Sequence, residues 1–163
     1  MISWMIAMAA ASDLDGTWVL ESDEREVRAA IEASAEHSVS SLPAPFQSRA
    51  MRKLTGKAGI CPRYELTVDD RNVAWGCEGS DPFSVTPDQL GSPVEIRHER
   101  QRVQATVTLD ASELGATFEA SGGRRTFVFG VAGDTLVVTQ EIHNDKLASP
   151  LRWETRYRRE LAP

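Results

Sequence analysis

Apolar and polar residues alternate strictly over most of the chain after residue 62. In RVQATVTLD, Val103, Ala105, Val107 and Leu109 are separated by polar side chains. Such alternation is typical of strands that bury one face. The same pattern recurs in RYELTV, NVAWGC, PFSVT, PVEIRH, ELGATFEA, RRTFVFGVA, GDTLVVTQEIH and PLRWETRYRRE. Together with DLDGTWVLES near the start, the pattern predicts nine or ten strands.

Two segments that follow the first strand have a helical period instead. In the first, Asp23 is the predicted N-cap, with Glu26 three residues later. Its predicted inner face consists of Val27, Ala30, Ile31 and Ser34. LPAP at 42–45 interrupts the pattern, and the second helix then places on one side Phe46, Ala50, Met51 and Leu54. Gly56 is the predicted stop. We therefore expect a helical hairpin at about residues 23–56.

Short turn sequences join the later strands and predict their arrangement. DDRN, SGG and AGD are turn signals, so successive strands should be antiparallel neighbours. A long meander protects its edges best by closing into a barrel. We therefore predict a single domain at 13–163 that is all-β with a small helical insert, an antiparallel up-and-down barrel of 8–10 strands. A Greek-key sandwich is the alternative, but it usually has a longer crossover between strands.

The first and last strands carry a recognisable pattern. Gly16-Thr17-Trp18 on the first strand resembles the G-x-W of the calycins, the superfamily of lipocalins and fatty-acid-binding proteins. The resemblance implies that Trp18 plugs the closed floor of the barrel, with Gly16 allowing close approach of backbone. It also implies that an arginine of the last strand packs across Trp18, either Arg159 or, as second choice, Arg158. The ending PLRWETRYRR resembles small secreted lipocalin-like proteins of bacteria.

The helical hairpin resembles the lid of fatty-acid-binding proteins, although it is longer. Those proteins hold a carboxylate with an inward R-x-Y on the last strand, but Thr155 stands here where the arginine would precede Tyr157. Arg156 should point outward by strand alternation. We therefore expect a lumen without a charged group, in which a long-chain alcohol and the matching acid bind about equally.

The chain start and the cysteines bear on location. Residues 1–12, MISWMIAMAAAS, read as a signal peptide remnant without a charged n-region, or else as a buried or disordered segment. The run is too short for a stable membrane span. Cys61 and Cys77 predict a disulfide in an exported chain, and two buried thiols are the alternative. The bond requires the chain before Pro62 to bend back. The expected location is periplasmic or extracellular.

Charge and polar residues exclude several functions. A formal charge of -6 argues against binding of nucleic acid. His37, His98 and His143 have no ligand spacing, so no metal site is expected. Asp69 and Asp70 fall in a hairpin turn, where carboxylates usually bond local backbone. The predicted outer face of the last strand carries Arg152, Arg156 and Arg158. No cofactor or catalytic set is expected.

The predicted inner face is rich in aromatic residues. The candidate ligand-lining residues are Leu66, Trp75, Phe118, Phe127, Phe129, Trp153 and Tyr157. The sequence thus favours a monomer that binds a small hydrophobic or amphipathic molecule beneath a helical lid, without catalysis. One alternative is a filled barrel that acts as an interaction or inhibitor protein through its outer surface. Another is a barrel enzyme, for which the inward polar candidates are Gln140, Thr155 and Tyr157.

Overall fold

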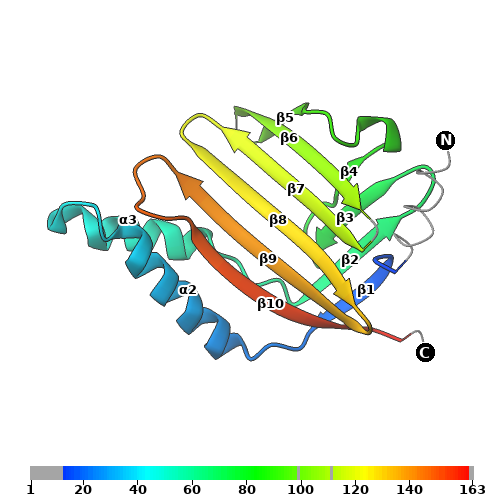
Figure 1. Ribbon diagram of the computed structural model, residues 1–163, viewed down its shortest axis with the longest axis horizontal. Coiled ribbons are helices and arrows are strands. Elements are labelled where there is room, and N and C mark those ends of the chain that lie inside the picture. Colours follow the sequence, from blue (N-terminus) through cyan, green and yellow to red (C-terminus); the bar gives the residue numbers. More distant parts are fainter. Residues whose placement is uncertain (1–12, 99, 111, 162–163) are drawn as a thin grey trace.

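Ten antiparallel strands form one strongly curled sheet in a computed structural model that describes residues 13–98, 100–110 and 112–161 (Figure 1). The predicted signal peptide remnant at 1–12 lies outside the described residues. The strands are β1 (Gly16–Leu20), β2 (Arg63–Val68), β3 (Val73–Cys77), β4 (Phe83–Val85), β5 (Val94–His98), β6 (Gln101–Asp110), β7 (Glu113–Ala120), β8 (Gly123–Ala132), β9 (Thr135–Asn144) and β10 (Leu151–Arg159). A short 3-10 turn, η1 (Pro87–Gln89), separates β4 from β5.

The strand order is that of an up-and-down meander, β4-β3-β2-β1-β10-β9-β8-β7-β6-β5, which confirms the predicted fold class. Every neighbouring pair is antiparallel, and β1 joins the last strand with Trp18 opposite Arg159. The ends of the order, β4 and β5, have no pairing register with each other among the described residues. The sheet therefore curls into a barrel-like shape without a complete ring of backbone hydrogen bonds.

Two helices lie between β1 and β2, as predicted. Helix α2 (Glu24–Val39) begins at Asp23, whose carboxylate accepts hydrogen bonds from the backbone N–H groups of Arg25 and Glu26. Helix α3 (Ala44–Lys57) continues one residue past Gly56, so the predicted stop is wrong by one residue. Among the described residues, no helix is long and apolar enough to cross a membrane.

The inner faces of the helices differ in part from the prediction. Val27, Ile31 and Leu54 are buried, as expected, whereas Ala30 is exposed. Phe46 is 60% exposed, so the prediction that it shares the inner side of the lid with Leu54 is wrong. Phe46 lies in the first turn of α3. This start of the helix is at the outer tip of the hairpin and extends beyond the sheet (Figure 1).

Two hydrophobic clusters fill the concave side of the sheet. The larger one lies between the sheet faces and includes Trp18, Tyr64, Trp75, Phe129 and Tyr157. The second joins the helices to the start of β10, and it consists of Val27, Ile31, Ala35, Val39, Leu54, Ala58, Leu151 and Trp153. The helical hairpin thus covers one end of the curled sheet, which we call the lid end. The opposite end, where β1 meets the end of β10, is the floor (Figure 1).

Helix α2, and Ser22 just before its N-cap, are hydrogen-bonded to the edge of β10 that β1 does not reach and to the loop before β10. The backbone N–H of Arg152 donates to Ser34 Oγ at 2.9 Å, and that of Arg156 donates to Ser22 Oγ at 2.8 Å. The backbone N–H of Ala148 donates to the carbonyl of Ser38 at 2.9 Å. These bonds fix α2 along the sheet, whereas α3 packs on α2 through Leu54 and Ala58.

The predicted disulfide is present. Cys61 and Cys77 are bonded, with their Cα atoms 5.7 Å apart. The turn at DDRN pairs Val68 with Val73 and sets Cys77 opposite Tyr64, as expected. The segment before Pro62 does bend back, because the Cα of Cys61 lies 5.7 Å from that of Cys77 although Cys77 is paired with Tyr64, three residues further along the chain.

Candidate functional site

The pairing register aligns the inward side chains of neighbouring strands in rows across the sheet, and successive rows lie further from the floor and closer to the lid end. The row nearest the floor contains Val131, Leu136 and Tyr157. The next contains Leu114, Phe129, Val138 and Thr155. The third contains Ala116, Phe127, Gln140 and Trp153, and the row nearest the helices contains Phe118, Arg125, Ile142 and Leu151. Apolar side chains dominate the lower rows, and polar nitrogens appear only in the upper two.

At the floor, Trp18 is fully buried and Arg159 lies over its ring, with the guanidinium carbon 4.3 Å from the ring centre. The indole Nε1 donates to the carbonyl of Leu14 at 3.0 Å, and the guanidinium donates to the carbonyls of Asp13 and Asp15. Gly16 has φ +132°, and a Cβ there would lie 2.9 Å from Arg159 Nη1. Glycine at this position therefore makes room for the arginine.

Six of the seven predicted ligand-lining residues fall in the larger cluster, and Trp153 falls in the cluster beneath the helices. Their rings are in direct contact. Trp75 lies 6.0 Å from Phe129 and 6.3 Å from Phe118, and Phe118 lies 6.0 Å from Phe127, measured between ring centres. Phe83 joins this group, 5.0 Å from Trp75. Most of the interior between the sheet faces is thus occupied by aromatic side chains.

An arginine points into this interior, so the expectation of a lumen without a charged group is wrong. Arg125 stands on β8 with the same parity as Phe127, and its guanidinium carbon lies 4.7 Å from the centre of that ring. Its Nη2 donates to Gln140 Oε1 at 2.9 Å. No carboxylate of the described residues forms an ion pair with Arg125.

Three nitrogens of the upper rows have no hydrogen-bond partner. They are Arg125 Nε, Gln140 Nε2 and Trp153 Nε1, and all three are inaccessible to solvent. They come from the adjacent strands β8, β9 and β10, with Gln140 directly opposite Trp153 in the register. Because all three are donors, the group that satisfies them has to supply acceptor atoms. We call these three side chains the donor cluster.

Burial governs the protonation of the groups around the donor cluster. It lowers the pKa of the Arg125 guanidinium, whereas Tyr64 acts in the opposite direction. Burial also raises the pKa of Tyr64. The nearby Tyr157 raises this pKa further, whereas Arg125 lowers it. For Tyr157, burial raises the pKa to about 12, against a smaller, lowering effect of the neighbouring Thr155 side chain. Both phenols are therefore neutral near pH 7.

Thr155 and Tyr157 occupy the places of the R-x-Y pattern but are bonded within the protein. Thr155 Oγ1 donates to the carbonyl of Val138 at 3.4 Å, and Tyr157 Oη donates to the carbonyl of Cys61 at 3.0 Å. Arg156 points outward and is exposed, as predicted, with its Nε 3.6 Å from Glu154 Oε1. The cationic group of the interior is thus on β8 rather than on β10.

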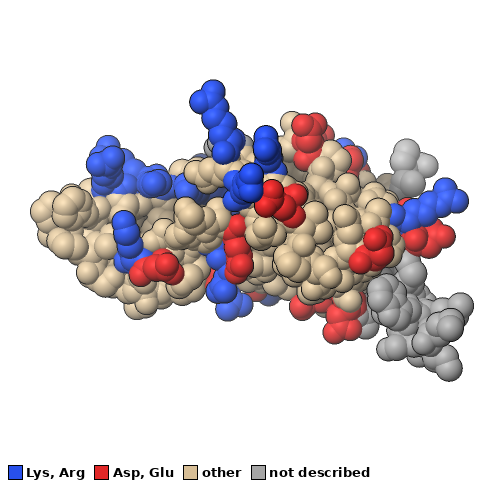
Figure 2. Space-filling model, turned by 90° about the horizontal axis from the view of Figure 1, so that it is seen from above, with Lys and Arg blue, Asp and Glu red and all other residues tan. Residues whose placement is uncertain are grey.

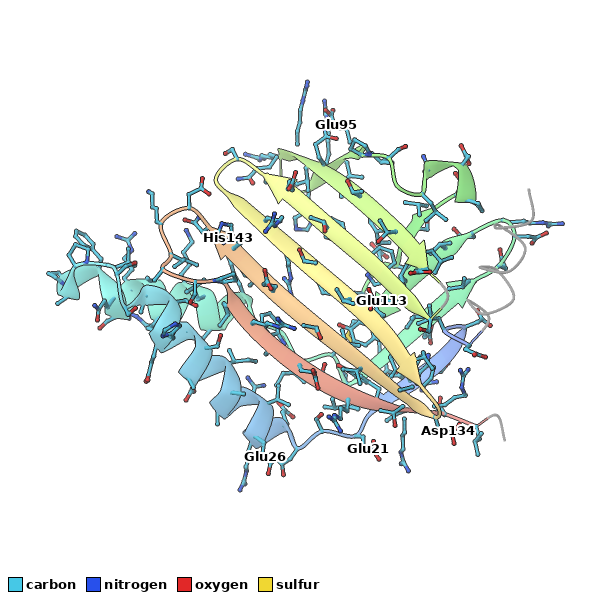
Figure 3. All side chains as sticks on the ribbon, in the orientation of Figure 1. Glu21, Glu26, Glu95, Glu113, Asp134 and His143 are labelled. Carbon is cyan, nitrogen blue, oxygen red and sulfur yellow. A yellow bond between two sulfur atoms is a disulfide. The ribbon has the colours of Figure 1, made fainter. Side chains whose placement is uncertain are left out.

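Two open pockets lie on the outer surface, at the N-terminal end of α2. The larger has a volume of about 470 Å³ and is lined by Glu21, Ser22, Asp23, Glu26, Val27, Ala30, Glu154 and Arg156. The other is lined by Asp23, Glu24, Arg25 and Arg28. Figure 3 shows Glu21 and Glu26 at this end of α2, away from the aromatic interior. Neither pocket is lined by the donor cluster.

Surface charge is unevenly distributed. Helix α3 exposes Arg49, Arg52, Lys53 and Lys57 and contains no acidic residue. In Figure 2 most of the charged side chains at the hairpin end of the molecule are Lys or Arg, whereas side chains of both signs are interspersed over the rest of this face. Of the histidines, His37 and His98 are exposed, and His143 lies at the end of β9 (Figure 3). They lie on three different elements, as the sequence spacing indicated.

Sequence reasoning missed Arg125, although a signal was present. In GRRTFVFG, Arg125 has the parity of Phe127 and Phe129, which were both predicted to face inward. An arginine on the aromatic face of a strand is the exception that marks a polar site, because a buried charge is unfavourable unless something pairs with it. Arg124, its neighbour, is exposed on the outer face.

Comparison with known proteins supports the fold. No protein-family profile matches the sequence, and no curated protein matches it. Among solved structures, a REP1-NXSQ fatty acid transporter aligns at 14% identity with a TM-score of 0.54, over 94% of this chain and 100% of that one. A secretory abundant heat soluble protein from Ramazzottius varieornatus aligns at 14% identity and 0.55, over 91% and 96%.

A third similar structure is the Schistosoma mansoni fatty acid binding protein in complex with arachidonic acid, at 15% identity and a TM-score of 0.52, over 93% and 99% of the two chains. Each of these alignments covers more than nine-tenths of this chain. The chain therefore has a calycin-like fold.

Proposed function

We propose that the chain binds a small amphipathic molecule inside the curled sheet, with an anionic oxygen group of that molecule on the donor cluster. The observation that carries this proposal is the set of three buried, unpartnered donors from Arg125, Gln140 and Trp153. Native proteins pair nearly all buried polar groups, so three unpaired donors on adjacent strands indicate an absent acceptor.

The chemistry of the cluster favours a carboxylate. A guanidinium binds carboxylates through directed, charge-assisted hydrogen bonds, and these are about twice as strong as neutral ones. Arg125 is only partly exposed and makes no ion pair within the described part of the chain, and its buried Nε lacks an acceptor in the unliganded protein, so an incoming anion would supply the missing partner. An alcohol supplies neither the charge nor a second acceptor atom.

The apolar part of the ligand has a complementary lining. Phe127 lies in the same row as Gln140 and Trp153, and Phe129 lies in the row below. Phe118 lies beside Arg125, and Trp75 of β3 contacts both Phe118 and Phe129. The rings are in contact, so a bound chain displaces or reorients them, and it enters beneath the helices that cover Trp153. The similar structures add support, since they include a fatty acid transporter and a complex with arachidonic acid.

The proposal also covers catalysis, location and oligomeric state. We propose that the protein is not an enzyme, since its fold neighbours are named as transporters and binding proteins. The disulfide supports an exported, periplasmic or extracellular location, where such bonds persist. We further propose that the barrel acts as a monomer on a small molecule rather than on nucleic acid.

Competition for an environment-sensitive dye tests the proposal. Dodecanoic acid should displace the dye at a concentration about 10- to 100-fold lower than dodecanol, because a hydrogen bond to a charged group contributes about 1.5–3 kcal/mol. Arg125→Met should abolish the preference. Arg124→Met is the matched control, since it removes the same charge from the outer face of the same strand. Equal binding of acid and alcohol by the parent protein would contradict the proposal.

A filled barrel that acts through its outer surface is the second candidate. The aromatic contacts across the interior favour it, as do the two pockets on the outside of α2. This protein would take up none of the apolar probes, and Arg125→Met would change only its stability. The dye experiment therefore separates the two candidates.

A further inference from the structure

Cys61 stands at the junction between the lid and the sheet. Helix α3 ends at Lys57 and β2 begins at Arg63, so five residues connect the two elements. Ala58 and Ile60 pack in the cluster beneath the helices, and Cys61 is the first residue of the connection that belongs to the cluster between the sheet faces. The disulfide to Cys77 therefore joins the end of the lid to β3.

The two helices are held in different ways. Helix α2 is bonded to β10 and the loop before it through Ser34 and Ser38. The described hydrogen bonds that involve α3 are local, within the helix or to its flanking turns. Packing on α2 and the covalent anchor at Cys61 thus position α3.

Cys61 also contacts the interior directly. Its carbonyl accepts the hydrogen bond from Tyr157 Oη at 3.0 Å, and Tyr157 is fully buried in the row nearest the floor. Tyr157 in turn lies 5.2 Å from Tyr64, ring centre to ring centre, and Tyr64 stands opposite Cys77. The anchor of the lid and the lining of the interior thus share one set of contacts.

We propose that the Cys61–Cys77 disulfide is a releasable anchor of the lid: its reduction frees α3 and speeds ligand exchange while the sheet stays folded. The part about ligand exchange rests on the proposed function, whereas the release of α3 does not. The sheet does not need the bond for its register, because β2 and β3 pair along their whole length through backbone hydrogen bonds.

The chemistry requires an external dithiol. Its thiolate attacks Cys77 Sγ, since Cys77 is partly exposed and Cys61 is buried. The bond between the two cysteine sulfurs breaks, Cys61 leaves as a thiolate and takes up a proton, and a mixed disulfide forms on Cys77. The second thiol of the reductant then releases Cys77. Two electrons and two protons pass to the cysteines, and the dithiol becomes a cyclic disulfide.

Amide hydrogen exchange on the full, ligand-free chain tests the release of α3. After treatment with dithiothreitol, the amides of residues 44–60 should exchange at least about tenfold faster, whereas those of β6–β9 keep their rates. The double variant Cys61→Ala/Cys77→Ala should behave like the reduced protein. Unchanged exchange in α3 would overturn the proposal, and so would equal acceleration in the sheet, because reduction would then unfold the domain.

Stopped-flow release of a bound anilinonaphthalene sulfonate dye tests the effect on exchange. The dissociation rate should rise at least about fivefold on reduction. Phe46→Ser with the disulfide intact is the matched control: it alters an exposed side chain of α3 but keeps the anchor and the interior lining, so the rate should change less than about twofold. Equal rates in oxidised and reduced protein overturn the proposal. Lack of dye binding in both states contradicts the proposed function, and hydrogen exchange then still decides on the anchor.

Discussion

The floor and the lid end of the interior each contain a tryptophan and an arginine, but the hydrogen bonding of these side chains differs between the two ends. At the floor, Trp18 Nε1 and the guanidinium of Arg159 both donate to backbone carbonyls. At the lid end, Trp153 Nε1 and Arg125 Nε have no partner. The same residue types thus form a completed contact at one end and an incomplete one at the other.

This difference in hydrogen bonding predicts that the floor contributes to stability and the lid end to ligand binding. A buried polar group with all its hydrogen bonds made stabilises the fold, whereas an unpaired one is unfavourable until a ligand or other group bonds to it. We therefore expect substitutions at the floor to change the free energy of unfolding, and substitutions at the lid end to change ligand affinity. Matched substitutions at the floor and at the lid end therefore allow the two ends to be compared directly.

The largest effect is expected at the floor tryptophan. Trp18→Ala should lower the free energy of unfolding by about 3–5 kcal/mol, because a large, fully buried ring is lost. Trp153→Phe at the lid end keeps one ring and removes the unpaired donor together with part of the indole volume, so it should lower stability by only about 1–2 kcal/mol. Urea denaturation measures both. Similar losses for the two variants would show that the ends do not differ in this way.

The two arginines should give opposite results. Arg125→Met should weaken binding of dodecanoic acid by about 10- to 100-fold and change stability by less than about 1 kcal/mol, since the lost hydrogen bond to Gln140 is offset by removal of the unpartnered Nε. Arg159→Met should keep the affinity and lower stability by about 1–2 kcal/mol through the lost contact with Trp18 and lost hydrogen bonds. Calorimetric titration and denaturation on the same samples provide the check, and a shared loss of binding would refute the division.

Alkaline pH should weaken the contact between the floor and the lid anchor. Burial raises the pKa of Tyr157 from 10.0 to about 12, so the folded state binds more protons than the unfolded state between these values. Stability is therefore intact below pH 10 and falls as the pH rises toward 12. Tyr64 contributes in the same direction. Tyr157→Phe should lose about 0.5–1.5 kcal/mol at pH 8 and show a flatter decline in denaturation midpoint above pH 10.

The smallest effect is expected at the tip of the lid. Phe46 is 60% exposed, so Phe46→Ser should change stability by less than about 0.5 kcal/mol. Ile31→Val, on the buried face of α2, removes a single methylene group and should still lower stability by about 0.5–1.5 kcal/mol. Thermal melts of both variants suffice. A larger loss from Phe46→Ser would mean that the tip of α3 is packed in solution.

The sequence was sufficient for the strands, their order and the helical insert, because a half-buried strand repeats every two residues and a covering helix does not. It also located Trp18, Arg159 and the disulfide. It failed where the outcome depends on tertiary geometry. Phe46 fits the helical pattern, but that pattern does not reveal that α3 extends beyond the sheet. The missing pairing between β4 and β5 likewise depends on curvature.

Arg125 was missed for another reason. On the last strand a carboxylate would be held where R-x-Y stands, and Thr155 does not fit that pattern. The neighbouring strand β8 supplies the guanidinium instead, opposite Ile142 and beside Gln140 in space. A polar site formed across three strands has no continuous signature in the chain, although the parity of each member is readable.

The serine contacts between α2 and β10 have a consequence for self-association. A strand edge with free N–H and C=O groups is a template on which a second chain can pair and aggregate. Along the part of β10 that β1 does not reach, Ser22 and Ser34 take up backbone N–H groups, and α2 lies across the approach. If α2 swung away with α3, this edge would be offered to other molecules. Under the proposed release of α3 alone, these serine hydrogen bonds stay in place, and the edge of β10 remains protected against intermolecular β-pairing.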